Sequence, residues 1–256
     1  MRKKIVGASW KMHINSIANG VSLAESLHQE VGNISDIDVF ILPPFPLIKE
    51  VATIFKHGNI GWGGQNMCFA AQGAYTGEVP GLMLKELGCQ YVELGHAERK
   101  AFFNETDQRV NQKLRLCQGL GLIPVLCIGE QKEDLRTGNE LNELKRQILT
   151  MLDSLDPTFI QNVILAYEPV WAIGQAQTAT LDYIEHIHAY LRSLIENHLG
   201  NQIANEIRII YGGSVNPEIS DELFQLPNVD GVFIGRFGLD PKNFKRIADS
   251  AIKSNH

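Results

Sequence analysis

Eight short apolar segments recur along the chain, and each is followed by a loop and a stretch with helical periodicity. They occupy residues 5–8, 39–42, 60–62, 91–94, 122–126, 163–167, 207–211 and 232–234. These segments are apolar almost throughout, which is typical of parallel strands buried on both faces. Pro124 lacks a backbone donor and is unfavourable inside a central strand, so we place it near the start of the fifth one.

The stretches between these segments carry apolar residues at helical spacing. The clearest predicted helix follows Thr180, a suitable N-cap, and repeats its apolar positions from Leu181 to Ile195. Asp240 and Pro241 predict the start of another helix, and further helices are expected at 23–31, 110–120 and 141–152. Eight alternating strand–helix units predict a single (β/α)8 barrel domain over residues 1–256.

A doubly wound open sheet is the alternative fold. Its phosphate-binding fingerprint, Gly-x-Gly-x-x-Gly, is expected directly after the first strand. That position holds Ser9, Trp10 and Lys11 instead, which favours the barrel.

Composition fits an ordinary globular protein, because hydrophobic residues make up 44% of the chain and charged residues 20%. Acidic residues outnumber basic ones by 29 to 23, and the net charge of −6 argues against a dedicated nucleic-acid binder. The four cysteines form no CxxC pair and are expected to be reduced thiols. The chain has no apolar stretch of membrane-spanning length and no convincing signal peptide, so we expect no membrane partner and a cytoplasmic location.

Functional residues of a (β/α)8 barrel lie where its strands end. At these positions stand Lys11, His96, Glu168, the turn 212–214 (Gly-Gly-Ser) and the pair Gly235-Arg236. A carboxylate at the end of a buried strand is costly unless it is used or paired, which favours a role for Glu168. His96 follows an apolar strand and a glycine, whereas the other seven histidines are interpreted as solvent-exposed or packing residues.

These side chains suit proton abstraction next to a carbonyl. A carboxylate base, a histidine electrophile and a lysine would form and hold an enediolate. The glycine-bearing turns after the seventh and eighth strands favour phosphate binding, and Asn216-Pro217 is predicted to begin a short helix there. No metal-ligand cluster is present in the sequence, and we expect no metal and no cofactor.

The chain resembles the triosephosphate isomerases along essentially its whole length. The resemblance is carried by WKM at 10–12, ELGH at 93–96, CIGE at 127–130, AYEPVWAIG at 166–174 and YGGSV at 211–215. It implies a TIM barrel in which Glu168 moves the proton, neutral His96 polarises the carbonyl and Lys11 stabilises the charged substrate, a small phosphorylated sugar. Ser9 takes the place of the family's usual asparagine beside the substrate. The phosphate would be held by main-chain N–H groups of Gly174, Ser214, Gly235 and Arg236.

The resemblance also implies a lid and a homodimer. The lid would comprise Pro169, Val170, Trp171, Ala172, Ile173, Gln175, Ala176 and Gln177. The segment that includes Tyr75, Thr76, Gly77 and Glu78 resembles the family's third loop, by which each subunit reaches into its neighbour.

Four departures from the family pattern bear on the substrate. Ser9 replaces an asparagine, Ala97 replaces the serine after the histidine, and Arg236 replaces a glycine. The lid tip reads Gln175-Ala176-Gln177 where Thr-Gly-Lys is common. None of them removes a catalytic group, so we expect interconversion of D-glyceraldehyde 3-phosphate and dihydroxyacetone phosphate. The alternatives are isomerisation of a four-carbon ketose phosphate such as L-erythrulose 1-phosphate and, from a different class, a non-catalytic phosphate-ligand sensor.

Overall fold

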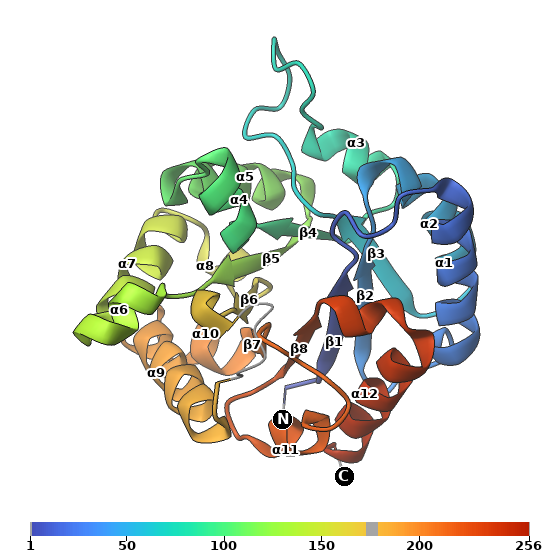
Figure 1. Cartoon of the computed structure of the whole chain (residues 1–256). Coiled ribbons are helices and arrows are strands. Elements are labelled where there is room, and N and C mark those ends of the chain that lie inside the picture. Colours follow the sequence, from blue (N-terminus) through green and yellow to red (C-terminus); the bar gives the residue numbers. More distant parts are fainter. Residues whose placement is uncertain (1, 173–178, 256) are drawn as a thin grey trace.

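Eight parallel strands close into one barrel in their order along the chain, as the sequence predicts (Figure 1). The structure is a computed structural model and describes residues 2–172 and 179–255. The strands are β1 (Ile5–Ser9), β2 (Asp38–Leu42), β3 (Ile60–Gly64), β4 (Tyr91–Leu94), β5 (Ile123–Ile128), β6 (Ile164–Tyr167), β7 (Arg208–Tyr211) and β8 (Gly231–Ile234). Each of the eight predicted segments forms one strand, and Pro124 is the second residue of β5.

Helices surround the barrel (Figure 1). The α-helices are α1 (Ile17–Val31), α2 (Ile48–Phe55), α3 (Gly81–Glu86), α4 (Ala97–Phe103), α5 (Asp107–Leu120), α6 (Lys132–Thr137), α7 (Glu140–Met151), α8 (Pro157–Ile160), α9 (Leu181–Leu199), α10 (Asn201–Glu206), α11 (Ser220–Gln225) and α12 (Pro241–Lys253). Three 3-10 helices are η1 (Phe45–Leu47), η2 (Val170–Ala172) and η3 (Arg236–Leu239).

The predicted helix starts are confirmed at α9 and α12 and corrected at α11. The Thr180 hydroxyl accepts a hydrogen bond from the Tyr183 amide, and the Asp240 carboxylate accepts from the first turn of α12. The short helix expected at Asn216-Pro217 begins later, at Ser220. The Asn216 side chain accepts from the amides of Glu218 and Ile219, as an N-cap side chain does, and residues 217–219 form a turn that leads into α11.

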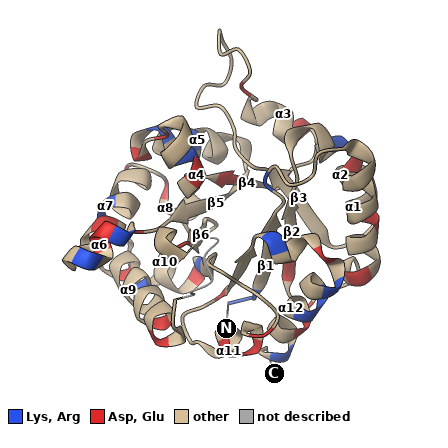
Figure 2. Cartoon of the chain, viewed as in Figure 1, with Lys and Arg blue, Asp and Glu red and all other residues tan. Residues whose placement is uncertain are grey.

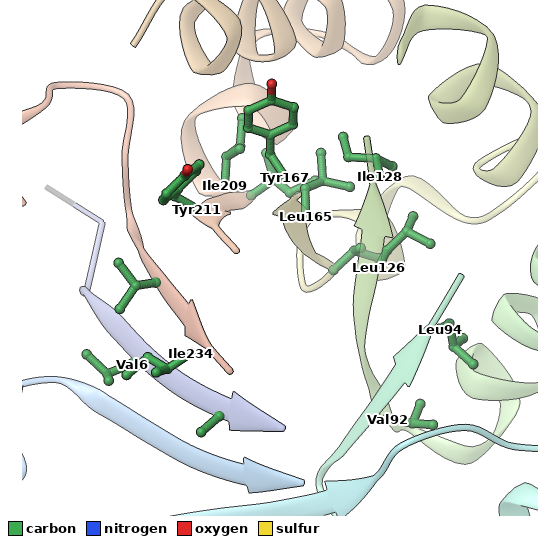
Figure 3. Close-up of a cluster of buried hydrophobic side chains, with 14 of the residues drawn as sticks. Val6, Val92, Leu94, Leu126, Ile128, Leu165, Tyr167, Ile209, Tyr211 and Ile234 are labelled. Carbon is green, nitrogen blue, oxygen red and sulfur yellow. The ribbon is translucent and has the colours of Figure 1, made fainter. Parts of the chain in front are cut away.

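Side chains of the strands alternate between the barrel interior and the helices. Val6, Val92, Leu126 and Ile209 belong to the cluster that continues into the surrounding helices (Figure 3). Inside the barrel, the Phe40 ring stacks on Tyr91 at a centroid distance of 4.6 Å and on Phe233 at 5.8 Å. The barrel interior is therefore a packed core, and a ligand cavity is expected at the rim of the barrel.

Charged residues lie mainly on the outer helices (Figure 2). This is the pattern expected of a barrel whose strands are covered by helices on the outer face and whose interior is filled by apolar side chains. Every helix in residues 2–172 and 179–255 falls short of the length and apolarity that a membrane crossing needs.

Gly7 makes room for the Phe40 ring, and replacing it tests the interior packing. A Cβ atom at position 7 would lie 2.0 Å from the Phe40 Cζ atom. We expect Gly7→Ala to lower the free energy of unfolding by about 1–3 kcal/mol through overpacking, measured by urea denaturation. Gly119→Ala in α5 is the control, because nothing lies within 4 Å of its Cβ position and alanine favours a helix. Equal stability of the two variants would contradict this packing.

Candidate active site

A cavity of about 600 Å³ opens at the carboxyl ends of the strands. It brings together the sequence-predicted residues that the structure describes: Ser9, Lys11, His96, Glu168, Ser214, Gly235 and Arg236. They come from the ends of β1, β4, β6, β7 and β8, as the rule for strand ends predicts.

His96 and Glu168 form the central contact of the cavity. The His96 Nε2 atom lies 3.1 Å from Oε2 of Glu168, and both side chains are about 95% buried. The Glu168 amide donates to the Ile128 carbonyl at 2.8 Å, which fixes its backbone beside β5. A Cβ atom at Gly212 would lie 2.5 Å from the Glu168 Cγ atom, so a glycine is required there. Position 97 offers no hydroxyl, and the Glu168 carboxylate faces His96 and, 3.6 Å from Oε1, the Cys127 thiol.

The hydrogen bonds of His96 assign its ring proton. His96 is the N-cap of α4, and its Nδ1 atom accepts from the Glu98 amide at 3.1 Å. The neutral ring therefore carries its proton on Nε2, toward Glu168. Burial lowers the pKa of His96, but the carboxylates of Glu168 and Glu93 outweigh it and raise the pKa to about 9.

Lys11 stands in the left-handed backbone region, with φ of 48°. The Gln65 amide holds this turn, because its Nε2 atom donates to the carbonyls of Lys11 at 3.0 Å and Leu42 at 2.9 Å. The Lys11 ammonium donates to Glu98 Oε1 at 2.8 Å. Burial lowers the pKa of Lys11, yet the carboxylates of Glu98 and Glu168 raise it above its ordinary value, so the ammonium keeps its charge in the cavity.

Ser9 borders the cavity from the end of β1 and contacts the barrel interior. Its hydroxyl donates to Glu93 Oε2 at 2.9 Å. Glu93 lies in β4 with 3% of its surface exposed. A second carboxylate therefore stands below the cavity, close to the His96–Glu168 pair.

The turns after β7 and β8 and the Arg236 side chain also line the cavity. Ser214 lies in the turn after β7, and Gly235 precedes η3, which begins with Arg236. Within the described part of the chain, the exposed Arg236 guanidinium has no ion-pair partner. Amides at the start of a short helix and a free guanidinium suit a phosphate.

The described part of the predicted lid is tied to the barrel. Pro169 leads into η2, and the Trp171 indole donates to Glu130 Oε1 at 2.7 Å. The Ser214 hydroxyl donates to the Ala172 carbonyl at 3.0 Å. The remaining lid residues Ile173, Gln175, Ala176 and Gln177, and the phosphate-binding residue Gly174, lie outside the described residues.

The predicted interface segment projects from the barrel between β3 and α3 (Figure 1). Tyr75, Thr76, Gly77 and Glu78 are all exposed, and the Tyr75 ring packs edge-on against Phe69. Large apolar side chains are exposed on neighbouring loops and helices as well, including Met12, Met83 and Phe102.

Three site residues were not assigned a role from the sequence, although a signal for two of them was present. Glu93 is a charged residue inside an apolar strand, and Glu130 follows β5 at the rim. The Glu130 Oε1 atom accepts hydrogen bonds from Tyr167, Trp171 and Tyr183, three donors that no sequence spacing connects. Cys127 looked like an ordinary core thiol, and only its contact with Glu168 distinguishes it.

Metal chemistry has no visible site in the described residues. They contain no group of three or more His, Cys, Asp or Glu side chains arranged to hold an ion.

Comparison with known proteins agrees with this geometry. A family model described as triosephosphate isomerase matches residues 4–251. The chain is 41% identical to the triosephosphate isomerase of Phocaeicola vulgatus, over 98% of this chain and 99% of that protein. It is 38% identical to the triosephosphate isomerase of Carboxydothermus hydrogenoformans, over 98% and 100% of the two chains. It is 40% identical to the probable triosephosphate isomerase 2 of Listeria monocytogenes, over 99% of both. The chain belongs to the triosephosphate isomerase family.

Proposed function

We propose that this chain is an aldose–ketose isomerase that interconverts D-glyceraldehyde 3-phosphate and dihydroxyacetone phosphate. The observation that carries the proposal is the 3.1 Å contact between His96 Nε2 and Glu168 Oε2 at the floor of the cavity. It sets a carboxylate base beside a proton donor, within a cavity that Lys11 and Arg236 also line. This is the constellation that proton transfer next to a carbonyl needs.

Glu168 is assigned the role of base. Its carboxylate removes a proton from the carbon next to the carbonyl, and the electron pair moves onto the carbonyl oxygen to form an enediolate. The His96 Nε2 proton is directed at that oxygen and neutralises its charge. His96 Nε2 then takes the proton of the hydroxyl on the neighbouring carbon, and Glu168 returns its own proton to that carbon as the new carbonyl forms. The aldose and the ketose thus interconvert without loss or gain of atoms.

The Glu98 amide on Nδ1 of His96 opposes the positive charge that the Glu168 carboxylate favours on its ring. The carboxylate raises the pKa of the buried imidazole in the resting pair. When Glu168 takes the substrate proton, that attraction disappears, and burial together with the Glu98 amide on Nδ1 favours the neutral ring. His96 therefore acts as a neutral electrophile during turnover.

The phosphate is assigned to the opposite side of the cavity, at Ser214, Gly235 and Arg236, with Gly174 contributing from the lid. The exposed guanidinium and the amides before η3 support this assignment. Lys11 lies between the two ends and offers a charge to the substrate. Closure of the lid residues 169–177 would exclude water from the enediolate.

We infer a homodimer from the projecting segment. The segment between β3 and α3 projects from the barrel (Figure 1), and its residues Tyr75, Thr76, Gly77 and Glu78 are exposed. Met12 is 92% exposed, and Phe102 is 75% exposed. Apolar side chains gathered around a projecting loop are typical of an obligate interface. The cytoplasmic location stays a prediction.

The role of Glu168 is tested by Glu168→Gln. The amide cannot take a proton, so we expect kcat on D-glyceraldehyde 3-phosphate to fall by about 10²–10⁴-fold with the fold unchanged, measured by a coupled assay and thermal melting. Glu133→Gln removes an exposed carboxylate on α6 and serves as the control. If the protein is a phosphate-ligand sensor, the wild type will show no turnover. If the wild type has a greater kcat/KM on L-erythrulose 1-phosphate than on D-glyceraldehyde 3-phosphate, the four-carbon ketose phosphate is the substrate.

The electrostatic coupling of the pair is tested in the same variant by nuclear magnetic resonance of the His96 ring. In the wild type, Glu168 raises the pKa of His96 to about 9. In Glu168→Gln the charge is gone while burial remains, so the pKa of His96 falls well below that value. A pKa that is higher in the folded than in the unfolded state stabilises the fold at low pH. In the wild type, the contribution of this pair to the free energy of unfolding is therefore fully present below about pH 6.5 and is lost as the pH rises through 9. An unchanged titration midpoint would refute the coupling.

The homodimer is tested by Thr76→Arg at the tip of the projecting segment. Thr76 is exposed, so the variant should fold, but a cationic side chain in a close interface should shift the mass measured by light scattering from two chains toward one. Thr137→Arg on α6, on another side of the barrel in Figure 1, is the control. A wild-type protein that has the mass of one chain would overturn the proposal.

A further inference from the structure

Glu93 is a buried carboxylate that the isomerase chemistry proposed above does not use. In β4, Val92 and Leu94 pack toward the helices, while Tyr91 belongs to the cluster inside the barrel. Alternation therefore turns Glu93 inward, where 3% of its surface is exposed. Burying a carboxylate is costly, and an aliphatic residue would fill the same space more favourably. Packing alone therefore does not explain a carboxylate at position 93.

The hydrogen bond to Ser9 supplies that reason. The Ser9 hydroxyl donates to Glu93 Oε2 at 2.9 Å. A serine hydroxyl has one proton and two lone pairs, and this bond uses the proton. Ser9 also borders the active-site cavity. Toward that cavity, its oxygen can only accept a hydrogen bond.

The charges around Glu93 belong to the same site. Burial raises the pKa of Glu93 to about 7, a rise that Glu168 supports and that His96, the Ser9 hydroxyl and Lys11 oppose. Above neutral pH the carboxylate is ionised, which keeps the Ser9 proton directed at it. Glu93 thus orients Ser9 and does not itself need to meet a ligand.

We propose that Glu93 is a positioning residue that makes Ser9 a hydrogen-bond acceptor, so that the end of β1 selects a ligand hydroxyl over a ligand carboxylate. The inference takes one point from the proposed function, namely that a phosphorylated ligand binds in this cavity. It narrows the ligand to a hydroxyl-bearing phosphate ester whose hydroxyl donates to Ser9. A ligand with an anionic oxygen at the same place would meet lone pairs and a buried negative charge.

The test compares two unreactive phosphate esters by calorimetry at about pH 8.5. Glycerol 3-phosphate has hydroxyls at the end opposite the phosphate, and 2-phosphoglycolate has a carboxylate there. In Glu93→Leu the Ser9 proton is free to turn toward the cavity. We expect the ratio of the two dissociation constants to shift by about tenfold toward the carboxylate ligand, the size expected for one reoriented hydrogen bond. Thermal melting should show a Tm no lower than that of the wild type, because an apolar residue replaces a buried charge.

Matched variants separate orientation from charge. Glu93→Gln removes the charge, but its amide oxygen can still accept the Ser9 proton, so its ratio should stay close to that of the wild type. Ser9→Ala should weaken glycerol 3-phosphate binding without strengthening 2-phosphoglycolate binding. Glu133→Gln controls for net charge.

An unchanged ratio in Glu93→Leu overturns the proposal, and so does a Glu93→Gln ratio equal to that of Glu93→Leu. Because both ligands are unreactive, the result is independent of turnover. A wild type without isomerase activity but with the expected shift in ratio would refute the proposed function and leave this inference standing.

Discussion

Closure of the barrel between β1 and β8 is the constraint on which the site depends. The two strands pair in parallel from Ile5 opposite Gly231 to Ala8 opposite Ile234. A Cβ atom at Gly231 would lie 2.1 Å from the Ile5 carbonyl oxygen, so this close approach requires glycine. Closure places the ends of β1 and β8 side by side, and with them Ser9, Lys11, Gly235 and Arg236. Without it, Ser9 and Lys11 would stand on one edge of an open sheet, and Gly235 and Arg236 on the other.

The barrel interior then has to accept charges that an apolar core would exclude. His96, Glu168 and Glu93 are each about 95% buried or more. The His96–Glu168 contact, the Ser9 hydroxyl and the Lys11 ammonium offset this burial. Each of these groups stands at the cavity or directly below it, while the deeper layer is filled by Phe40, Tyr91 and Phe233. The deeper aromatic layer thus stabilises the barrel, while the charged groups lie in the layer at the cavity.

The sequence was sufficient for the fold and for most of the residues that line the cavity. The eight apolar segments identified all eight strands, and the residues that follow them meet in one cavity. Contacts across the barrel could not be foreseen. Ser9 and Glu93 are 84 positions apart on strands that do not pair, so only the stagger of the closed barrel brings them together.

The sequence analysis also did not predict which neighbouring groups form hydrogen bonds with one another. Asn216 accepts from two amides of the turn that leads into α11, and Glu168 lies beside His96 where position 97 offers no hydroxyl. In both cases the outcome depends on which nearby donor or acceptor is free, and the order of residues does not record this.

Glu130 has a consequence for how the rim of the barrel can move. One of its oxygens accepts from Tyr167 on the barrel, Trp171 in η2 and Tyr183 on α9. A hydrogen bond to a charged group contributes about 1.5–3 kcal/mol. Displacing Trp171 alone would forfeit one such bond, and carrying Glu130 along would disturb two others. The hydrogen bonds of Glu130 thus connect η2, where the proposed lid begins, to α9 at the periphery. Substitutions at Tyr183, which does not line the cavity, would weaken this network without altering any residue that lines the cavity.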